Sequence, residues 1–146
     1  MIKNVFWIDR KIFIYDYVAS TWSQSYVLVK SEFTYVMSVA FQTSDCLLVG
    51  VYNTNGGIYA YRLTGGDWSL ESSLTAPNGN DAQTIAVSGN NVLIGCGSNV
   101  MKAYYYTYSS ATWSQVQTLS ANNNYFGMGV AIDGDVAMVS ANQDSK

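Results

Sequence analysis

The sequence predicts an all-β fold made of a repeated unit of four short antiparallel strands. Phrases led by tryptophan recur at Trp22, Trp68 and Trp113, which are 46 and 45 residues apart. Aromatic and β-branched residues alternate with polar ones at the period of two that turns one face of a strand inward. Gly, Asn, Asp and Ser, which suit tight turns, separate these segments. Four strands in about 45 residues is the size of a β-propeller blade.

Four anchors keep the same order and spacing in three copies. The first is an alternating run, found as Phe13/Tyr15/Tyr17, Tyr59/Tyr61/Leu63 and Tyr104/Tyr106/Tyr108. The second is the tryptophan phrase with a leucine six residues later, at Leu28, Leu74 and Leu119. The third is an apolar triplet, Val39-Ala40-Phe41, Ile85-Ala86-Val87 and Val130-Ala131-Ile132. The fourth is a run of four residues that starts at Leu48, Leu93 and Met138.

Each anchor is interpreted as one strand. Residues 1–8 are the least regular, because Ile2–Val5 align with Leu48–Val51 but carry Lys3; they are either a second strand or a lead before the first strand. The other expected strands are Ile12–Tyr17, Trp22–Leu28, Val36–Phe41, Leu47–Val51, Ile58–Leu63, Trp68–Leu74, Thr84–Val87, Val92–Cys96, Ala103–Tyr108, Trp113–Leu119, Gly127–Ile132 and Ala137–Ala141.

The clearest copy of the unit runs from Trp113-Ser114-Gln115 through Leu119 to Phe-Gly-Met-Gly-Val-Ala-Ile-Asp-Gly-Asp-Val-Ala-Met-Val-Ser-Ala at residues 126–141. This phrase resembles the FG-GAP class of β-propeller repeat. The resemblance is looser upstream, where Tyr35-Val36 and Asp81-Ala82 stand at the place of the Phe-Gly pair. It implies that the Phe-Gly strand lies nearest the propeller axis, that the Trp strand is outermost, and that the protein is extracellular or at the cell surface.

The expected organisation is one propeller segment with two complete and two partial blades. Residues 1–34 form a partial blade, residues 35–80 and 81–125 form complete blades, and residues 126–146 start a further blade. Closure takes typically four to eight blades, so sheet edges and blade faces would stay open. Either the segment belongs to a longer propeller, or two chains associate, the last two strands of one completing the first half-blade of the other.

The composition argues against several classes of protein. The net charge is −3 and histidine is absent, which does not fit a basic nucleic-acid surface and removes the commonest general base. No run of 18 or more apolar residues spans a membrane, and the N-terminus does not read as a signal peptide. Cys46 and Cys96 are expected ~15 Å apart, too far for a disulfide, and are interpreted as small buried hydrophobes.

No catalytic, cofactor or metal site is predicted. Some FG-GAP blades bind calcium in the loop between their first two strands, but here that loop is residues 42–45, 88–90 or 133–135, with at most two carboxylates. Calcium takes about six to eight oxygen ligands. Asp133 and Asp135 are interpreted as solvated turn residues rather than a glycosidase pair. The glycine pairs at residues 56–57 and 65–66 lack the Lys and Thr of a phosphate-binding loop.

Two groups remain as candidate binding residues. The tyrosines of the alternating runs would stack on sugars or pack between blades, and their spacing favours packing; Tyr105 should point away from Tyr104 and Tyr106. The tryptophans are expected in the core or between blades. Asn78, Asn80 and Asn122–Asn124 lie on crossings at one rim, where they either bind a partner or form turns.

The expected function is a non-catalytic interaction or scaffold module. Its expected partners are a protein or a glycan, and further blades supplied by the same chain or by self-association, with no nucleic acid and no membrane span. A carbohydrate-binding (lectin) module is the alternative. A hydrolase whose catalytic residues lie outside this chain is a third and weaker one.

Overall fold

The structure is a computed structural model of the chain, and it describes residues 3–8, 10–52, 57–75, 82–97, 100–122 and 124–141. These residues form thirteen strands. The strands are β1 Lys3–Ile8, β2 Lys11–Val18, β3 Thr21–Val29, β4 Tyr35–Thr43, β5 Cys46–Tyr52, β6 Gly57–Thr64, β7 Asp67–Thr75, β8 Thr84–Ser88, β9 Asn91–Cys96, β10 Lys102–Ser109, β11 Thr112–Ser120, β12 Gly129–Asp133 and β13 Val136–Ser140. Within the described ranges there is no helix of the length and apolarity that crossing a membrane requires.

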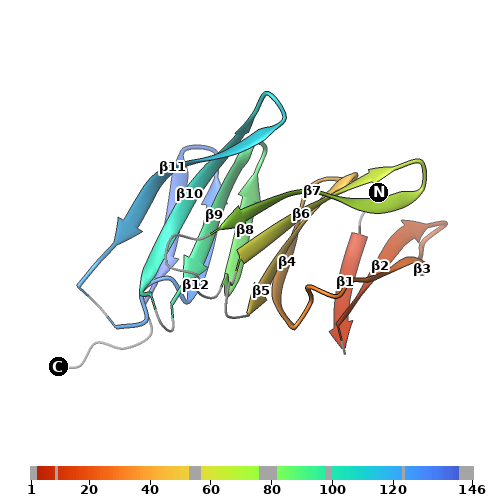
Figure 1. Cartoon of the computed structure of the whole chain (residues 1–146), viewed down its shortest axis with the longest axis horizontal. Helices are drawn as coiled ribbons and strands as arrows, with labels where there is room; N and C mark the ends of the chain where they lie inside the picture. The colour runs from red at the N-terminus through yellow and green to blue at the C-terminus, as the bar shows by residue number, and fades with distance from the viewer. Residues whose placement is uncertain are drawn as a thin grey trace.

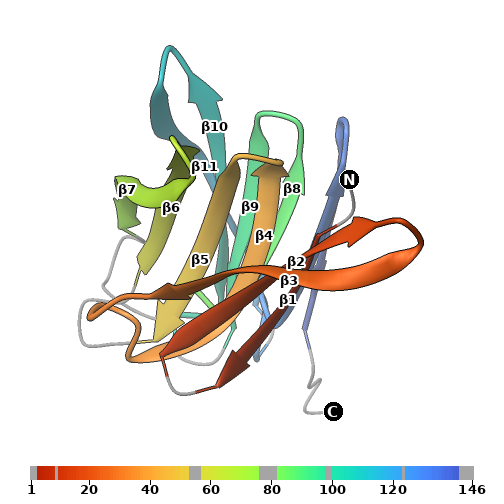
Figure 2. The ribbon, with the colours of Figure 1, turned by 90° about the vertical axis from the view of Figure 1, so that its right-hand side faces the viewer.

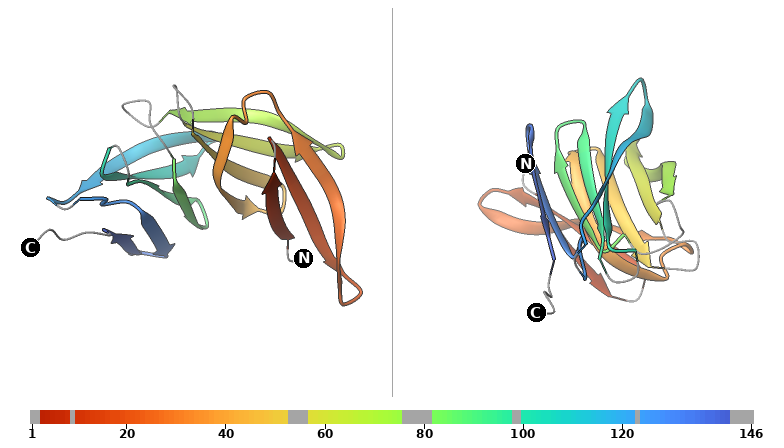
Figure 3. Two further views of the ribbon diagram at one scale, coloured as in Figure 1. Left: turned by 90° about the horizontal axis from the view of Figure 1, so that it is seen from below. Right: turned by 90° about the vertical axis from the view of Figure 1, so that its left-hand side faces the viewer.

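The strands form four antiparallel sheets in chain order (Figure 1). The first sheet is β1-β2-β3, the second β4-β5-β6-β7, the third β8-β9-β10-β11 and the last β12-β13. They lie along an open arc with the first and last sheets at its ends (Figure 3, left), and Figure 2 views this arc from the side of the first sheet. The inner strand β8 contacts both β4 and β12. The predicted all-β propeller segment with open ends is therefore confirmed.

The expected strands are present, with shifts at some ends. Residues 3–8 are a strand, β1, which pairs with β2 from Lys3↔Asp16 to Ile8↔Lys11. The alignment predicted for this strand was wrong by three residues: Phe6 lies opposite Phe13, as Val49 lies opposite Tyr59. The strand expected from Gly127 starts instead at Gly129, because the Met128 N–H donates to the Tyr125 carbonyl (3.2 Å) and closes a turn.

The proposed closure by two chains, in which β12 and β13 complete a first half-blade, does not fit the first sheet. That sheet has three strands rather than two, and β1 holds the second place, next to β2. In the second and third sheets this place belongs to β5 and β9. Compared with the four-stranded sheets, the first sheet lacks only the innermost strand, which would lie next to β1. There is therefore room for one added strand and not for two.

A β-bulge recurs at the same place in the outer strand pair of three sheets. It lies at Ile14/Tyr15, Ala60/Tyr61 and Tyr105/Tyr106, which are 46 and 45 residues apart. A bulge increases the local twist of a strand pair, so each outer hairpin turns in the same way. This confirms the repeat in backbone geometry as well as in sequence.

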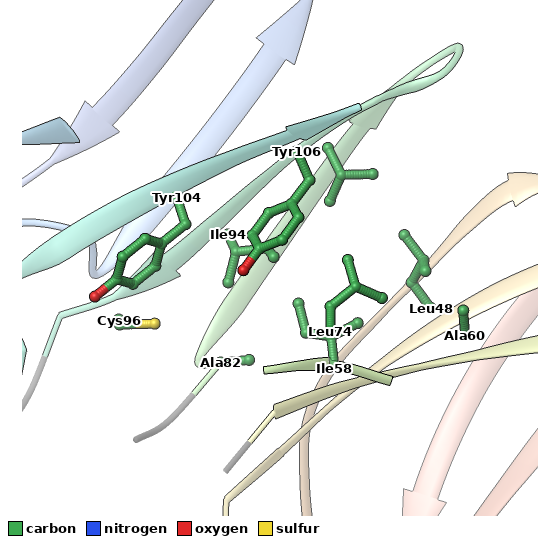
Figure 4. Packing of buried hydrophobic residues seen from close by; sticks show 10 residues of the cluster. Leu48, Ile58, Ala60, Leu74, Ala82, Ile94, Cys96, Tyr104 and Tyr106 are labelled. Carbon is green, nitrogen blue, oxygen red and sulfur yellow. The ribbon is translucent and has the colours of Figure 1, made fainter. Parts of the chain in front are cut away.

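Two hydrophobic clusters join the sheets face to face. Each sheet has an N-side face, toward the sheet before it in the chain, and a C-side face, toward the sheet after it. Between the first two sheets, Ile12, Ile14 and Leu28 pack against the N-side face that carries Tyr61 and Trp68. Between the second and third sheets, the C-side residues Leu48, Ile58, Ala60 and Leu74 pack against Ile94, Tyr104 and Tyr106 (Figure 4). Both interfaces therefore join an aliphatic C-side face to an N-side face that carries aromatic rings.

Glycines let the backbone of one sheet approach the next. A Cβ atom at Gly95 would lie 2.2 Å from the Gly127 carbonyl oxygen. At the previous interface, a Cβ atom at Gly50 would lie 2.5 Å from the Ala82 carbonyl oxygen. Ala82 thus occupies the place of Gly127, in agreement with the alignment of Asp81-Ala82 with the Phe-Gly pair. Gly127 also has a φ of 99°, which only glycine adopts readily.

Both cysteines are buried and free, as predicted. Cys46 starts β5 and Cys96 ends β9. Burial raises the pKa of the Cys46 thiol from its ordinary 9.0 to about 11, although the Arg62 charge opposes this rise. The thiol is therefore protonated at neutral pH.

Substitution of Gly95 by alanine tests the close approach of the backbones. The added methyl group meets backbone and Thr84 Oγ1 (2.5 Å), so we expect a loss of about 1–3 kcal/mol in the free energy of unfolding by urea. Gly89→Asn is the control: its φ of 58° suits asparagine and no atom lies within 4 Å of the added Cβ. Equal stability of the two variants would contradict this account.

The thiols give a second test. With a pKa of about 11, Cys46 has almost no thiolate at pH 8, and Cys96 is fully buried. We expect Ellman's reagent to label neither thiol in the native protein and both after denaturation in guanidinium. Because folding raises the pKa of the Cys46 thiol, the protonated thiol contributes fully to the stability of the folded state below pH 9. This contribution is lost as the pH rises toward 11. Rapid labelling of the native protein at pH 8 would exclude this burial.

Candidate functional site

An apolar cleft separates the third sheet from the last. Its volume is about 280 Å³, and Leu93, Tyr105, Gln117, Leu119, Ile132, Gly134, Asp135, Val136 and Ala137 line it. It exists because the third sheet has four strands and the last sheet has two. The C-side face of the outer strands β10 and β11 is therefore uncovered beside β13.

The floor of the cleft is apolar and its rim is polar. Leu93 is fully buried, whereas Gln117 and Asp135 are exposed at the edges. The Tyr105 hydroxyl donates to Asn91 Oδ1 at 2.9 Å, which holds the ring over the floor. Tyr105 points away from the cluster of Tyr104 and Tyr106, as predicted. This arrangement offers apolar contact with a few polar groups at the margin.

The outer edge of β13 lies beside this cleft. In the described residues β13 pairs with β12 alone, from Gly129↔Ser140 to Asp133↔Val136. In the second and third sheets the strand at the equivalent place pairs with a third strand, β6 or β10. The free N–H and C=O groups of such an edge can pair with an added strand.

A polar cluster of Asp45, Arg62, Glu71 and Tyr108 joins the second sheet to the third. Arg62 Nη2 donates to both Glu71 oxygens (3.1 Å each) and to the Tyr108 hydroxyl (3.1 Å). Tyr108 donates to Glu71 Oε1 at 3.0 Å. Asp45 lies 3.6 Å from Arg62 Nη1. Because the guanidinium already faces two carboxylates, this cluster is a brace between sheets rather than an anion site.

The electrostatics of this cluster follow from its contacts. The hydrogen bond from Thr43 (2.6 Å) lowers the pKa of Asp45; burial opposes this, and the Arg62 charge adds to it. Burial and the hydrogen bond to Glu71 raise the pKa of Tyr108. Burial lowers the pKa of the Arg62 guanidinium, but the nearby Cys46 and Glu71 raise it by more, so the net shift is upward. All these groups keep their ordinary charges at neutral pH.

The turns considered for calcium are tied to one another. The Gln42 side chain donates to Asn90 Oδ1 (3.0 Å), and the Gly134 N–H donates to Ser88 Oγ (3.0 Å). Asp133 and Asp135 lie exposed at the β12–β13 turn. Among the residues that the structure describes, no three of His, Cys, Asp and Glu gather as metal ligands would. The expectation that the chain binds no metal stays a prediction.

The predicted aromatic residues divide into buried and exposed groups. Tyr61, Tyr104 and Tyr106 are buried between sheets, which confirms the packing interpretation for them. Burial raises the pKa of Tyr106 to about 12. Tyr17 and Trp22 on the first sheet are instead 42% and 39% exposed, so Trp22 is not a core residue. Their ring centroids lie 5.1 Å apart.

The asparagines of the crossings are only partly described. Asn122 and Asn124 are exposed. Asn78, Asn80 and Asn123 lie outside the described residues, and so does Gly56 of the first glycine pair. Gly65 and Gly66 have φ values of 64° and 94° in the β6–β7 turn, as a tight hairpin requires.

Sequence reasoning missed the cleft and the Arg62 cluster. One sequence signal was present: Arg62 stands where the next copy has Thr107. The first copy has the charged Asp16 at this position, so the three copies differ there. The cleft had no comparable signal, because it depends on the strand number of the last sheet.

The last part of the chain is similar in sequence to a known family of repeats. Residues 113–146 match the family of FG-GAP repeats. This range includes β11, the Phe-Gly turn against Gly95 and the hairpin β12–β13, so the resemblance predicted from residues 113–141 is confirmed. A search of curated proteins found no match.

Solved structures share the fold over most of the chain. A chain from the crystal structure of a mitotic checkpoint complex has a TM-score of 0.69 at 16% identity, over 91% of this chain and 42% of that chain. A protein from Lactobacillus plantarum has a TM-score of 0.62 at 16% identity, over 79% of this chain and 34% of that protein. These likenesses concern the fold, and this chain spans less than half the length of either neighbour.

Removal of the Arg62 charge tests whether this cluster stabilises the contact between the second and third sheets. Arg62→Met leaves the Asp45 and Glu71 carboxylates without their cation, so we expect a loss of about 0.5–1 kcal/mol in the free energy of unfolding by urea. A double-mutant cycle with Glu71→Gln should give a coupling of about 0.5–1 kcal/mol. Lys11→Met, at an exposed site on β2, should change stability by less than about 0.5 kcal/mol. A coupling free energy of zero would show that the Arg62–Glu71 contact does not stabilise the fold.

Proposed function

We propose that the chain is a non-catalytic protein-interaction module of an extracellular or cell-surface protein, and that it binds an extended polypeptide strand at the free edge of β13. The observation that carries this proposal is the coincidence of that edge with the apolar cleft. An added strand pairs its backbone with β13 and places alternate side chains in the cleft. This mode of binding combines main-chain hydrogen bonds with side-chain pockets.

The chemistry of the partner follows from the cleft. Leu93, Leu119 and Ile132 accept apolar or aromatic side chains at every second position of the strand. The residues between them point to the opposite face of the added strand, away from the cleft and from Gln117. The chain's own third strands have this pattern, as in Tyr59-Ala60-Tyr61 of β6.

Three further observations support a non-catalytic module outside the cell. The sequence has no histidine, and Arg62 and Glu71 are engaged in the brace between sheets. FG-GAP repeats, which residues 113–146 match, are typical of extracellular and cell-surface proteins. Binding by an edge strand needs no titrating group, so it agrees with this composition.

A synthetic peptide with the sequence of residues 102–120 tests the proposal. It carries the third and fourth strands of the third sheet, so it supplies what the last sheet lacks. We expect saturable binding by fluorescence anisotropy, and loss of binding on Ala137→Arg, because Ala137 lines the cleft. Met138→Arg is the matched control: Met138 is the next residue and lies on the opposite face. Equal affinity for a scrambled peptide, or no effect of Ala137→Arg, would reject edge binding.

The lectin alternative depends on one observation, the exposed rings of Tyr17 and Trp22. Paired aromatic faces of this kind can stack on sugar rings. A glycan array separates the two functions: binding that disappears with Trp22→Ala and survives Ala137→Arg favours a lectin. A silent array together with peptide binding favours the protein-interaction module.

A further inference from the structure

The turn between β12 and β13 places a carboxyl group directly before a glycine. Asp133-Gly134 is the only Asp-Gly pair in the sequence. Asp133 ends β12, pairs with Val136 and is exposed. The loop between the two strands is Gly134-Asp135, and the φ of 54° at Gly134 suits the first residue of such a loop. No atom lies within 4 Å of a Cβ atom added at Gly134, so the turn is open on that side.

This carboxyl group is peculiar to the last of the three inner hairpins. The last residue of the inner strand is Thr43 in the second sheet and Ser88 in the third, and it pairs across the turn as Asp133 does. Both of these residues carry a hydroxyl group, so the hairpin does not need a carboxylate to form. Only Asp133 combines a carboxyl group with a following glycine, and such a pair is chemically reactive because glycine has no side chain to hinder ring closure.

We propose that Asp133 isomerises spontaneously to isoaspartate in the native protein, and that the Ser88 hydroxyl slows this reaction. The Gly134 nitrogen attacks Asp133 Cγ and loses its proton, and the carboxyl group leaves as water, so that a five-membered succinimide forms. Water then adds to the ring at the main-chain carbonyl carbon of Asp133, and the bond from that carbon to the Gly134 nitrogen breaks. One water leaves and one returns, so mass and charge are unchanged.

Ser88 acts on the attacking nitrogen from the neighbouring sheet. The Gly134 N–H donates to Ser88 Oγ at 3.0 Å. The nitrogen has to leave this hydrogen bond, and its peptide plane has to turn, before it can reach the carboxyl carbon. The net stability of one neutral hydrogen bond corresponds to a factor of about five in an equilibrium constant. The third sheet therefore sets how long the turn of the last sheet keeps its original backbone.

Isomerisation changes the backbone of the hairpin. The main chain of the product runs through Asp133 Cβ and Cγ, so it gains one atom before Gly134. A loop of two residues fits the pair Asp133↔Val136 closely, and we expect this pair and the contact of Gly134 with Ser88 to be lost first. This proposal does not depend on the binding of a strand at the edge of β13.

Ageing of the native chain at physiological temperature and neutral pH tests the proposal. After proteolysis, liquid chromatography with electron-transfer mass spectrometry separates isoaspartyl from aspartyl peptides of equal mass. We expect isoaspartate to accumulate at residue 133, and about fivefold faster in Ser88→Ala. Ser88→Thr keeps the hydroxyl group and should stay near the native rate. Asp133→Thr introduces the residue found at the equivalent Thr43 and should remove the signal.

Thr43→Ala is the matched control, because it removes the equivalent hydroxyl group one sheet away and should leave the rate at residue 133 unchanged. Circular dichroism checks that each variant keeps its strands. If Ser88→Ala does not fold, Ser88→Cys gives the same test with a weaker acceptor of similar size. A synthetic peptide of residues 129–140 gives the rate without Ser88. A native chain that forms no isoaspartate at residue 133 while the peptide does overturns the proposal. Equal rates with and without the Ser88 hydroxyl overturn the role of Ser88.

Discussion

The packing of sheets face to face is the constraint on which the rest of the structure depends. Each sheet is apolar on both faces, as β5 illustrates with Cys46 to Val51 fully buried. A strand buried on both faces cannot show simple alternation of polar and apolar residues, and its sheet needs a neighbour on either side. Tyrosines on the N-side face meet small and aliphatic residues on the C-side face, so the sheets stack in one direction only.

Close approach of the backbones adds a second constraint, and it explains the Phe-Gly phrase physically. The carbonyl before an inner strand presses against Gly50 or Gly95 of the preceding sheet. The pressing residue itself can be Ala82 where φ is ordinary, but it must be glycine at residue 127 where φ is 99°. Glycine is therefore required at residue 127, where φ is positive, and not at residue 82. The same backbone contact forms at Ala82 although the Phe-Gly pair is absent there.

The strands and their order could be predicted from the sequence because both depend on local patterns. The period of two fixes which residues share a face, and the 45-residue spacing places the tryptophans on the outer strands β3, β7 and β11. The register of β1 could not be predicted in this way, because it depends on the short turn that leads to Lys11 rather than on the repeat. The contact of Arg62 with Tyr108 joins residues 46 apart in different sheets, and no pattern within one strand specifies it. The cleft depends on strand number, which local patterns also leave open.

Several charged side chains among the described residues stabilise contacts between neighbouring parts of the fold. Glu32 illustrates this: burial alone would raise the pKa of its carboxyl, but the hydrogen bonds from Tyr61 (2.5 Å), from a backbone N–H and from Ser31 (3.2 Å), with the Lys30 charge, together outweigh it and lower the pKa. The carboxylate thus fixes the crossing before β4 to the second sheet, as Glu71 fixes the second sheet to the third. Both charges are therefore engaged in contacts that hold neighbouring parts of the fold together. The apolar cleft beside β13 lies outside these contacts, and it is there that we propose binding of an added strand.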